Sequence, residues 1–181
     1  LSENEAEYIK KGEQANYHKG YKCSIRKSWY IVPQSWMPEA FMLRQINKYP
    51  KMVLNSTNAT NTDTLHKIRF LDGVNGYAVT AAFLNSYTFA LSEITGRSYG
   101  GGVMTFEPGE IRKLKIPMKF ADKLDLNYID QLMRNKQVEK VLDYTDKILL
   151  SEGLGLTNKE IGILRNIWDK LVNRRLYRKL A

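Results

Sequence analysis

The stretch GRSYGGGVMTFEP, residues 96–108, places a basic residue, an aromatic residue and three successive glycines side by side. Glycines let main-chain N–H groups come close to a phosphate, and the residues before them could add side-chain donors. The stretch lacks the GxxxxGK(S/T) and GxGxxG patterns, which argues against a nucleotide or dinucleotide site. The candidate phosphate contacts are Arg97, Ser98, Tyr99, Gly100 and Gly101. The structural alternative is a helix that ends at Gly96, with a flexible turn after it.

A second candidate stretch is RKSWYIVP, residues 26–33, in which basic residues precede aromatic ones. Interleaved cations and aromatic rings can bind phosphates and stack on bases, so Arg26, Lys27 and Tyr30 are candidate contacts. Successive side chains of a strand point to opposite faces, so either Trp29 or Tyr30 would face the core. An aromatic sheet core with a solvated basic start explains the same residues equally well.

The polar segment NATNTDT, residues 58–64, supplies short amides and hydroxyls. Asparagine can read adenine and threonine can read several base edges, so Asn58, Asn61 and Thr62 are candidate DNA contacts. The same composition is also typical of an ordinary turn. We interpret the neighbouring His66 as a structural histidine and not as a ligand or base.

The residue types that catalysis or metal binding needs do not come together in this sequence. It contains no GxSxG motif and no Pro-Pro pair, and an adenine methylase needs a Pro-Pro-aromatic motif to hold the flipped base. The single cysteine, Cys23, and the two histidines, His18 and His66, argue against a structural zinc site. We assign no catalytic residue and no metal ligand, and we expect the chain alone to be inactive.

The charge balance favours a polyanionic partner. The chain has 181 residues, with 28 lysines and arginines against 19 acidic residues, which gives a net charge of +9. Nucleic acid is the first candidate and an anionic membrane surface the second. One cysteine cannot form an internal disulfide, so we expect a reducing compartment, the cytoplasm. No apolar run is long enough to span a membrane and no signal peptide is visible, so no membrane is predicted as a partner.

Hydrophobic patterning predicts an α+β fold in two parts, a β-rich part with a buried helix over 1–120 and an all-helical part over 121–181. Residues 1–20 form a polar lead-in with one helical turn. The expected strands are 27–33, 51–57, 65–71 and 101–106, and 41–46 is a strand or a short helix. One buried helix is expected over 76–95, and a short helix opens at Pro108. The chain begins with Leu1 and not with Met, so we expect a piece of a longer protein.

The second part is expected to consist of helices. Asp125 can cap one helix, residues 137–153 show helical spacing, and Thr157 with Glu160 forms a capping box before the last helix. The basic residues of that last segment are Arg165, Lys170, Arg174, Arg175, Arg178 and Lys179. They could form a solvated face, contact DNA phosphates, or bind a membrane surface.

Three segments occur in an order that resembles a known family: YKCSIRKSWYIVP, KMVLNSTNATNTDTLHKIRF and AAFLNSYTFALSEITGRSYGGGVMTFEPGEIRKLKIP. They resemble the C-terminal part of bacterial adenine-specific DNA methyltransferases of restriction–modification systems, with a TaqI-like C-terminal specificity domain. The resemblance covers most of residues 17–181. It is a pattern of ordered segments and not a single signature.

The resemblance implies a division of labour between two parts of a parent protein. In such enzymes an N-terminal Rossmann-like domain binds S-adenosylmethionine and methylates adenine N6, while the C-terminal domain binds double-stranded DNA and selects the sequence. This chain is similar only to the second part, so the resemblance implies no cofactor in this chain and, as partners, DNA and the upstream catalytic domain. The alternative is a protein-interaction module that docks onto a methylase or restriction subunit without reading DNA. A self-sufficient nuclease ranks last.

Overall fold

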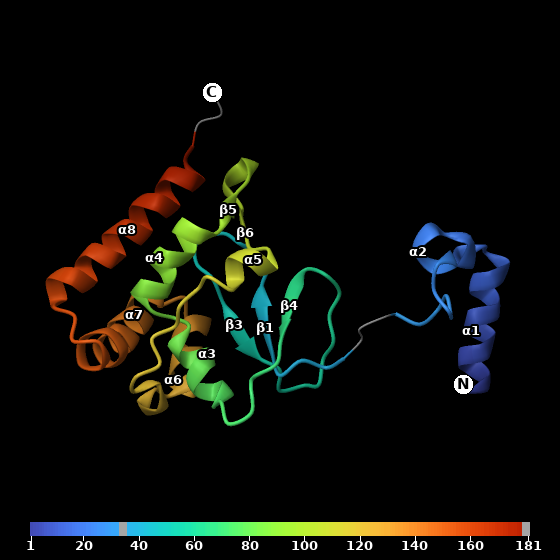
Figure 1. Cartoon of the computed structure of the whole chain (residues 1–181), viewed down its shortest axis with the longest axis horizontal. Coiled ribbons are helices and arrows are strands. Elements are labelled where there is room, and N and C mark those ends of the chain that lie inside the picture. Colours follow the sequence, from blue (N-terminus) through green and yellow to red (C-terminus); the bar gives the residue numbers. More distant parts are fainter. Residues whose placement is uncertain (33–35, 179–181) are drawn as a thin grey trace. The chain divides into compact units, whose positions relative to one another are not determined.

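The computed structural model describes residues 1–32 and 36–178, and the chain forms two compact units, Leu1–Trp36 and Met37–Ala181 (Figure 1). The first unit contains α1 (Glu3–Gln14), the 3-10 helix η1 (Tyr17–Lys19) and α2 (Tyr21–Ser24). Helix α1 begins at a capping box, in which the Glu5 carboxylate accepts from the Ser2 N–H and Ser2 Oγ accepts from the Glu5 N–H. The prediction of a lead-in with one helical turn was therefore wrong, because the cap and the helix-favouring residues after it sustain 12 helical residues.

The aromatic run of the first unit packs against helix α1 through Trp29 and does not form the predicted strand over 27–33. Residues 27–32 are turn and irregular structure, and Pro33 lies outside the described residues. The Trp29 ring lies against Gly12 of α1, where a Cβ would clash with it, and its indole N–H donates to Glu13 Oε1 at 3.3 Å. The reason for the difference is that a strand needs a neighbouring strand for its hydrogen bonds, whereas Trp29 finds a helix face.

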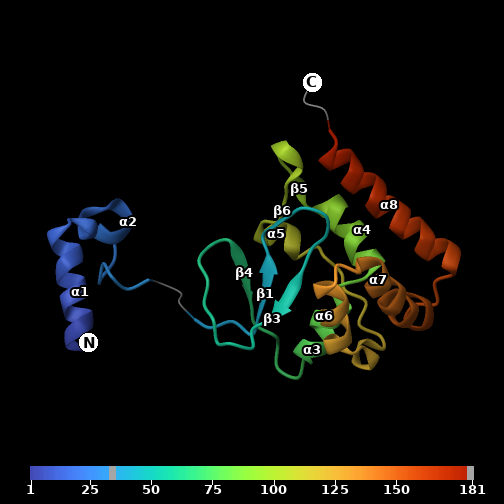
Figure 2. The ribbon, with the colours of Figure 1, turned by 180° about the vertical axis from the view of Figure 1, so that it is seen from behind.

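The second unit contains two small antiparallel sheets, visible from both sides in Figures 1 and 2. In the first sheet β1 (Ala40–Leu43) lies between β3 (Met52–Leu54) and β4 (Leu65–Ile68). In the second sheet β6 (Met104–Thr105) lies between β2 (Gln45–Ile46) and β5 (Arg97–Ser98). The ambiguous segment 41–46 is thus strand, shared between the two sheets, and the other strands of this unit are shorter than predicted.

The predicted helix over 76–95 is two helices, α3 (Gly76–Ala82) and α4 (Ser86–Thr95). Asn85 separates them. Its side-chain oxygen accepts from the Thr88 N–H at 2.9 Å and its amide donates to the Ala82 carbonyl at 2.6 Å, so it caps both ends. Gly96 ends helix α4, as predicted, and the Gly96 N–H donates to the Ser92 carbonyl.

The remaining helices are η2 (Gly100–Gly102), α5 (Pro108–Ile111), η3 (Ala121–Lys123), α6 (Leu126–Arg134), α7 (Val138–Asp146), the π-helix η4 (Lys147–Gly153) and α8 (Asn158–Leu176). Several of them were predicted from the sequence signals, whereas the 3-10 helices η2 and η3 and the π-helical form of η4 were not predicted. Pro108 is the first residue of α5, Asp125 caps α6, and Thr157 with Glu160 forms the capping box of α8. These three predictions are confirmed. The helices and antiparallel sheets together make the α+β fold that the patterning predicts.

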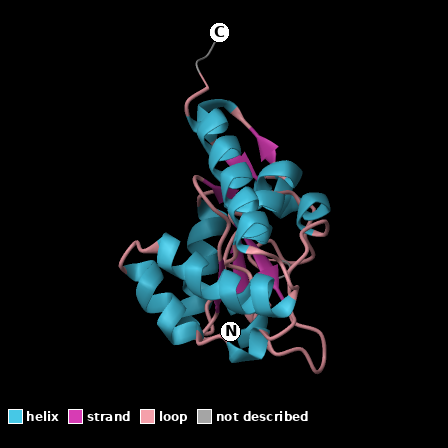
Figure 3. Cartoon of the chain, turned by 90° about the vertical axis from the view of Figure 1, so that its left-hand side faces the viewer, coloured by secondary structure: helices cyan, strands magenta, loops and turns pink. Residues whose placement is uncertain are grey.

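The core of the second unit draws on both sides of residue 120. Phe89 of α4 packs with Trp168 of α8 and with Tyr49, whose ring stacks on Phe89 at 5.4 Å between centroids. Helix α8 packs along α4, and α4, α7 and α8 lie on one side of the sheets, where they cover the strands (Figures 1 and 3). Residues 37–181 are therefore one compact unit, and a functional division between 1–120 and 121–181 stays a prediction.

Candidate nucleic-acid interface

The glycine-rich stretch forms an antiparallel hairpin, residues 97–105, which we call the glycine hairpin. Arg97 pairs with Thr105 and Ser98 with Met104, and the Tyr99 N–H donates to the Val103 carbonyl at 2.9 Å. The residues at its tip, 98–101, are exposed. The hairpin therefore presents a hydroxyl, a phenol ring and bare main chain to solvent.

The three glycines have different roles. A Cβ at Gly100 or Gly101 would meet no atom within 4 Å, so the surface over the tip is open. Gly102 is buried, with a φ of +74°, and a Cβ there would lie 3.1 Å from Leu176 Cα. Both the left-handed backbone and the contact with α8 require glycine at position 102. The stretch is thus an accessible tip on a base that packs against α8.

Arg97 is exposed but has an acidic partner. Its Nε lies 3.0 Å and its Nη2 2.9 Å from Glu110 Oε1. The hydrogen bond and the charge of Glu110 raise the pKa of Arg97. Burial acts to raise the pKa of Glu110, but the hydrogen bond from Arg97 and the Glu107 N–H outweigh it, and the pKa of Glu110 is lowered. Glu110 thus holds the Arg97 side chain in place at the start of the hairpin and offsets part of its charge.

The last turn of α8 and the residues directly after it add two cations next to the hairpin. A cavity of about 230 Å³ is lined by Glu93, Ser98, Met104, Leu171, Arg174, Arg175 and Arg178. Arg174 and Arg178 are exposed, and neither has an ion-pair partner among the described residues. The structure therefore brings Ser98 of the predicted site together with two arginines of the tail.

Arg175, in contrast, is buried and fully engaged. Its side chain is 4% exposed, its Nη2 lies 2.7 Å from Glu93 Oε1, and its Nε donates to Glu93 Oε2 at 3.1 Å. It also donates to the carbonyls of Gly102 and Asn47. Neither a solvated face nor a phosphate contact fits Arg175, because its donors are bound to α4, the hairpin and the β2–β3 loop. Lys179 of the same tail lies outside the described residues.

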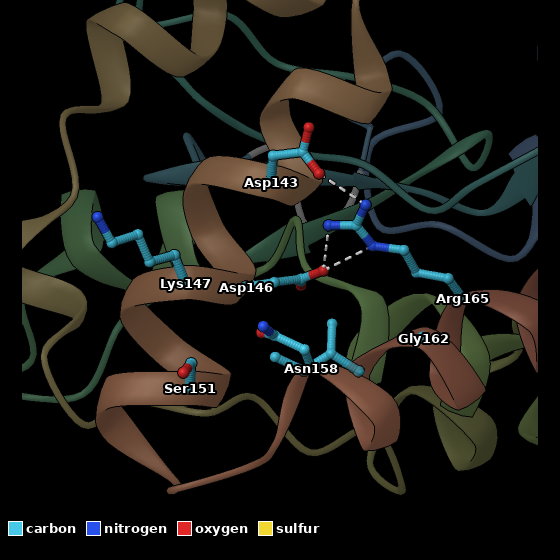
Figure 4. A pocket seen from close by; sticks show the side chains of 8 residues that line it. Asp143, Asp146, Lys147, Ser151, Asn158, Gly162 and Arg165 are labelled. Carbon is cyan, nitrogen blue, oxygen red and sulfur yellow. Dashed lines mark hydrogen bonds and ion pairs between the residues drawn. The ribbon is translucent and has the colours of Figure 1, made fainter.

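A second cavity, of about 300 Å³, lies between α7, the π-helix η4 and α8 (Figure 4). Arg165 lines this cavity and forms two ion pairs, with Nη1 2.7 Å from Asp143 Oδ1 and Nη2 2.8 Å from Asp146 Oδ2. Asp146 is buried and also accepts from the Ser86 N–H and hydroxyl, at 2.8 and 2.6 Å. This network joins α4, α7 and α8 and satisfies its own charges, so we interpret it as structural. Among the described residues, no group of three or more His, Cys, Asp or Glu side chains could hold a metal ion.

Comparison with known proteins gives a family. Residues 1–150 match the family model described as the C-terminal domain of Type II methyltransferase M.Eco57I. The chain belongs to this family. It is also 24% identical, over 160 residues, to Type II methyltransferase M.AccI from Acinetobacter calcoaceticus. That alignment covers 81% of this chain and 29% of the relative, so the chain spans less than a third of the relative's length. No solved structure matches the chain.

In this methyltransferase C-terminal domain, the predicted contacts of the polar loop lie between β3 and β4. Asn58 and Thr62 are exposed, whereas the Asn61 amide donates to the Thr62 and Leu65 carbonyls at 2.6 and 2.8 Å. The polar composition that made Asn61 a candidate DNA contact is therefore also explained by its hydrogen bonds within the loop. His66 is a structural histidine, as predicted: its Nε2 lies 2.8 Å from the Phe106 carbonyl.

Arg44 connects this loop to the glycine hairpin. It lies 3.5 Å from the Asp63 carbonyl of the loop and 2.7 Å from Glu107, two residues after β6. The hydrogen bond with Glu107 and its charge raise the pKa of Arg44, with smaller contributions from Asp63 and Tyr99. Sequence reasoning missed this residue, because a lone arginine between two short strands carries no motif. The loop and the hairpin therefore share one charged link.

The candidate residues of the first unit belong to a compact unit of their own, Leu1–Trp36. Lys27 and Tyr30 are exposed, and Arg26 Nη1 donates to the Trp29 carbonyl at 3.4 Å. Their role in DNA contact stays a prediction. None of the helices in 1–32 and 36–178 is long and apolar enough to cross a membrane.

Proposed function

We propose that this domain is the DNA-binding target recognition part of a site-specific adenine-N6 DNA methyltransferase. The observation that carries the proposal is the glycine hairpin, whose open tip lies beside Arg174 and Arg178, two cations with no ion-pair partner in the described part of the chain. The net charge of +9 supports a polyanionic partner. Membership in a methyltransferase C-terminal domain family supports DNA as that partner.

In this proposal, two kinds of contact divide the work. Arginine and lysine side chains and the bare main chain of the tip contact phosphates, which supplies affinity and sets the register on the duplex. Exposed side chains of the loop and hairpin, Asn58, Thr62 and Tyr99, are the candidates for reading base edges in the major groove. A good bidentate contact would discriminate against the wrong base by about 1–3 kcal/mol. Binding would also help a catalytic domain extrude its adenine, because a base inside the stack is out of reach.

The glycine hairpin does not fit a loop that binds S-adenosylmethionine. The three glycines lie in an antiparallel hairpin, whereas a Rossmann-type loop lies between a parallel strand and a helix. We therefore place S-adenosylmethionine, and the methyl transfer for which it supplies the methyl group, in another part of the parent protein. That catalytic part, the second proposed partner, would act with this domain in the bacterial cytoplasm.

Equilibrium binding against salt tests the proposal. A fluorescein-labelled duplex is titrated with the chain at several salt concentrations, and anisotropy is measured. If about six phosphates are contacted, log K should fall with log salt with a slope of about −5. Absent binding, or a slope near zero, would contradict the proposal and favour the protein-interaction module that docks without reading DNA.

A further inference from the structure

The cavity between the end of α8 and the glycine hairpin has the composition of an anion site. Its lining carries three guanidinium groups, of Arg174, Arg175 and Arg178, and one carboxylate, of Glu93. That carboxylate is already bound by Arg175. The charge left for a ligand is therefore the charge of Arg174 and Arg178.

We propose that this cavity binds one phosphodiester group of the DNA backbone, an inference that rests on the proposed function and gives it a defined site. Arg174 lies in the last turn of α8 and Arg178 follows two residues after the helix ends at Leu176, and both side chains line the cavity. The planar fork of a guanidinium matches the oxygens of a phosphate, and two forks can clamp one group. Ser98 adds a hydroxyl donor from the hairpin.

The other wall of the cavity suits a nucleotide backbone better than a free anion. Met104 and Leu171 complete the lining with apolar surface. A phosphodiester carries sugar carbons on both sides, which can pack on such a wall, whereas an inorganic phosphate cannot. The volume of about 230 Å³ leaves room for these neighbouring groups.

Arg175 and Gly102 are positioning residues for this site. Arg175 ties α8 to Glu93 of α4 and to the Gly102 carbonyl at the base of the hairpin. Gly102 lets the hairpin lie close to the helix, because a Cβ at this position would come within 3.1 Å of Leu176 Cα. The two arginines on either side of Arg175 are therefore held against the hairpin before any ligand arrives. They lie beyond residues 1–150, which match the family model.

The test compares three forms of the 181-residue chain on the same labelled duplex: the natural sequence, Arg174→Gln/Arg178→Gln, and the control Lys140→Gln/Lys159→Gln. The control removes the same charge from exposed positions, and Lys159 lies 15 residues from Arg174 on α8, about 22 Å along the helix. We expect the arginine pair to weaken binding about tenfold. The slope of log K against log salt should also flatten by about 0.9, the value for one phosphate. The loss should be equal on two duplexes of unrelated sequence, because a phosphate carries no sequence information.

A second variant separates the clamp from net charge. Ser98→Ala removes a neutral donor, so it should weaken binding a few-fold without changing the salt slope. Urea unfolding of each variant checks that it folds. If the natural chain binds DNA and the arginine and lysine pairs behave alike, the phosphate site is wrong while the proposed function stands. If the natural chain does not bind DNA, the proposed function itself fails.

Discussion

Helix α8 and the two residues after it carry two kinds of arginine, and each kind lines a cavity. Arg165 in the cavity of Figure 4 lies against Asp143 and Asp146, so its charge is satisfied within the protein. Arg174 and Arg178 line the cavity at the glycine hairpin and have no acidic partner among the described residues. The comparison teaches that charge and a hollow do not identify a binding surface. The number of internal partners decides whether an arginine stabilises the fold or stays available to a ligand.

The sharpest test of this comparison is between two adjacent arginines. Arg175→Met should lower the free energy of unfolding by about 3–5 kcal/mol, because it leaves the buried Glu93 carboxylate unpaired. Arg174→Met, one position earlier on the exposed face, should change it by less than about 0.5 kcal/mol. Urea unfolding measures both. Equal effects would mean that the two arginines are not different in kind.

The cavity of Figure 4 offers a second test. Asp146→Asn should cost about 2 kcal/mol, because the buried carboxylate accepts from Ser86 and from Arg165. Asp143→Asn removes the other ion pair of Arg165. Because the Asp143 side chain is 66% exposed, this change should lower the free energy of unfolding by less than about 1 kcal/mol. Thermal unfolding of both variants gives the comparison. If Asp146→Asn is neutral, the network does not hold the three helices together.

The glycine hairpin should respond position by position. Gly102→Ala should destabilise by about 2 kcal/mol, because it combines a positive φ with a close contact to α8. Gly101→Ala, with a φ of +72° but open space, should cost about 1 kcal/mol. Gly100→Ala should be close to neutral. Urea unfolding of the series would contradict this account if position 100 proved as sensitive as position 102.

The smallest expected effect is on the pH dependence of stability. The folded pKa of Glu110 is lowered from its ordinary value of 4.5, because the bonds from Arg97 and the Glu107 N–H outweigh burial. The stabilisation is then present above pH 4.5 and is lost as the pH falls through the lower folded pKa. In Glu110→Gln, the urea midpoint should fall less steeply below pH 4.5 than in the natural chain. If the midpoints of both chains fell equally with decreasing pH, Arg97 would not be held by this carboxylate.

Much of the fold followed from local signals in the sequence. The caps at Asp125 and Thr157 and the start at Pro108 depend on neighbours a few residues away, so they could be read directly. The break at Asn85 was missed, because its buried cap lies inside an apolar run that looks like one helix. The strand predicted around Trp29 was wrong, because the contact of Trp29 with Gly12 depends on tertiary packing that local sequence patterns do not show.

The candidate site was predicted in part. The exposed tip followed from the glycines and their neighbours, since open turns depend on local chemistry. The sequence could not separate Arg174 from Arg175, because only the placement of Glu93 on α4 makes the second one buried. It also could not bring Arg178 to Ser98, 80 residues away in the chain, because that contact depends on the packing of α8 along α4.

Amide hydrogen exchange of the chain with and without a DNA duplex tests the central claim most directly. The account predicts slower exchange on DNA binding in residues 97–103 and 170–178, the hairpin and the end of α8. Residues 140–153, beside the self-satisfied cavity of Figure 4, should be unchanged. Protection confined to α7 and η4, with none at the hairpin, would contradict the claim that the hairpin and the end of α8 form the DNA-binding surface.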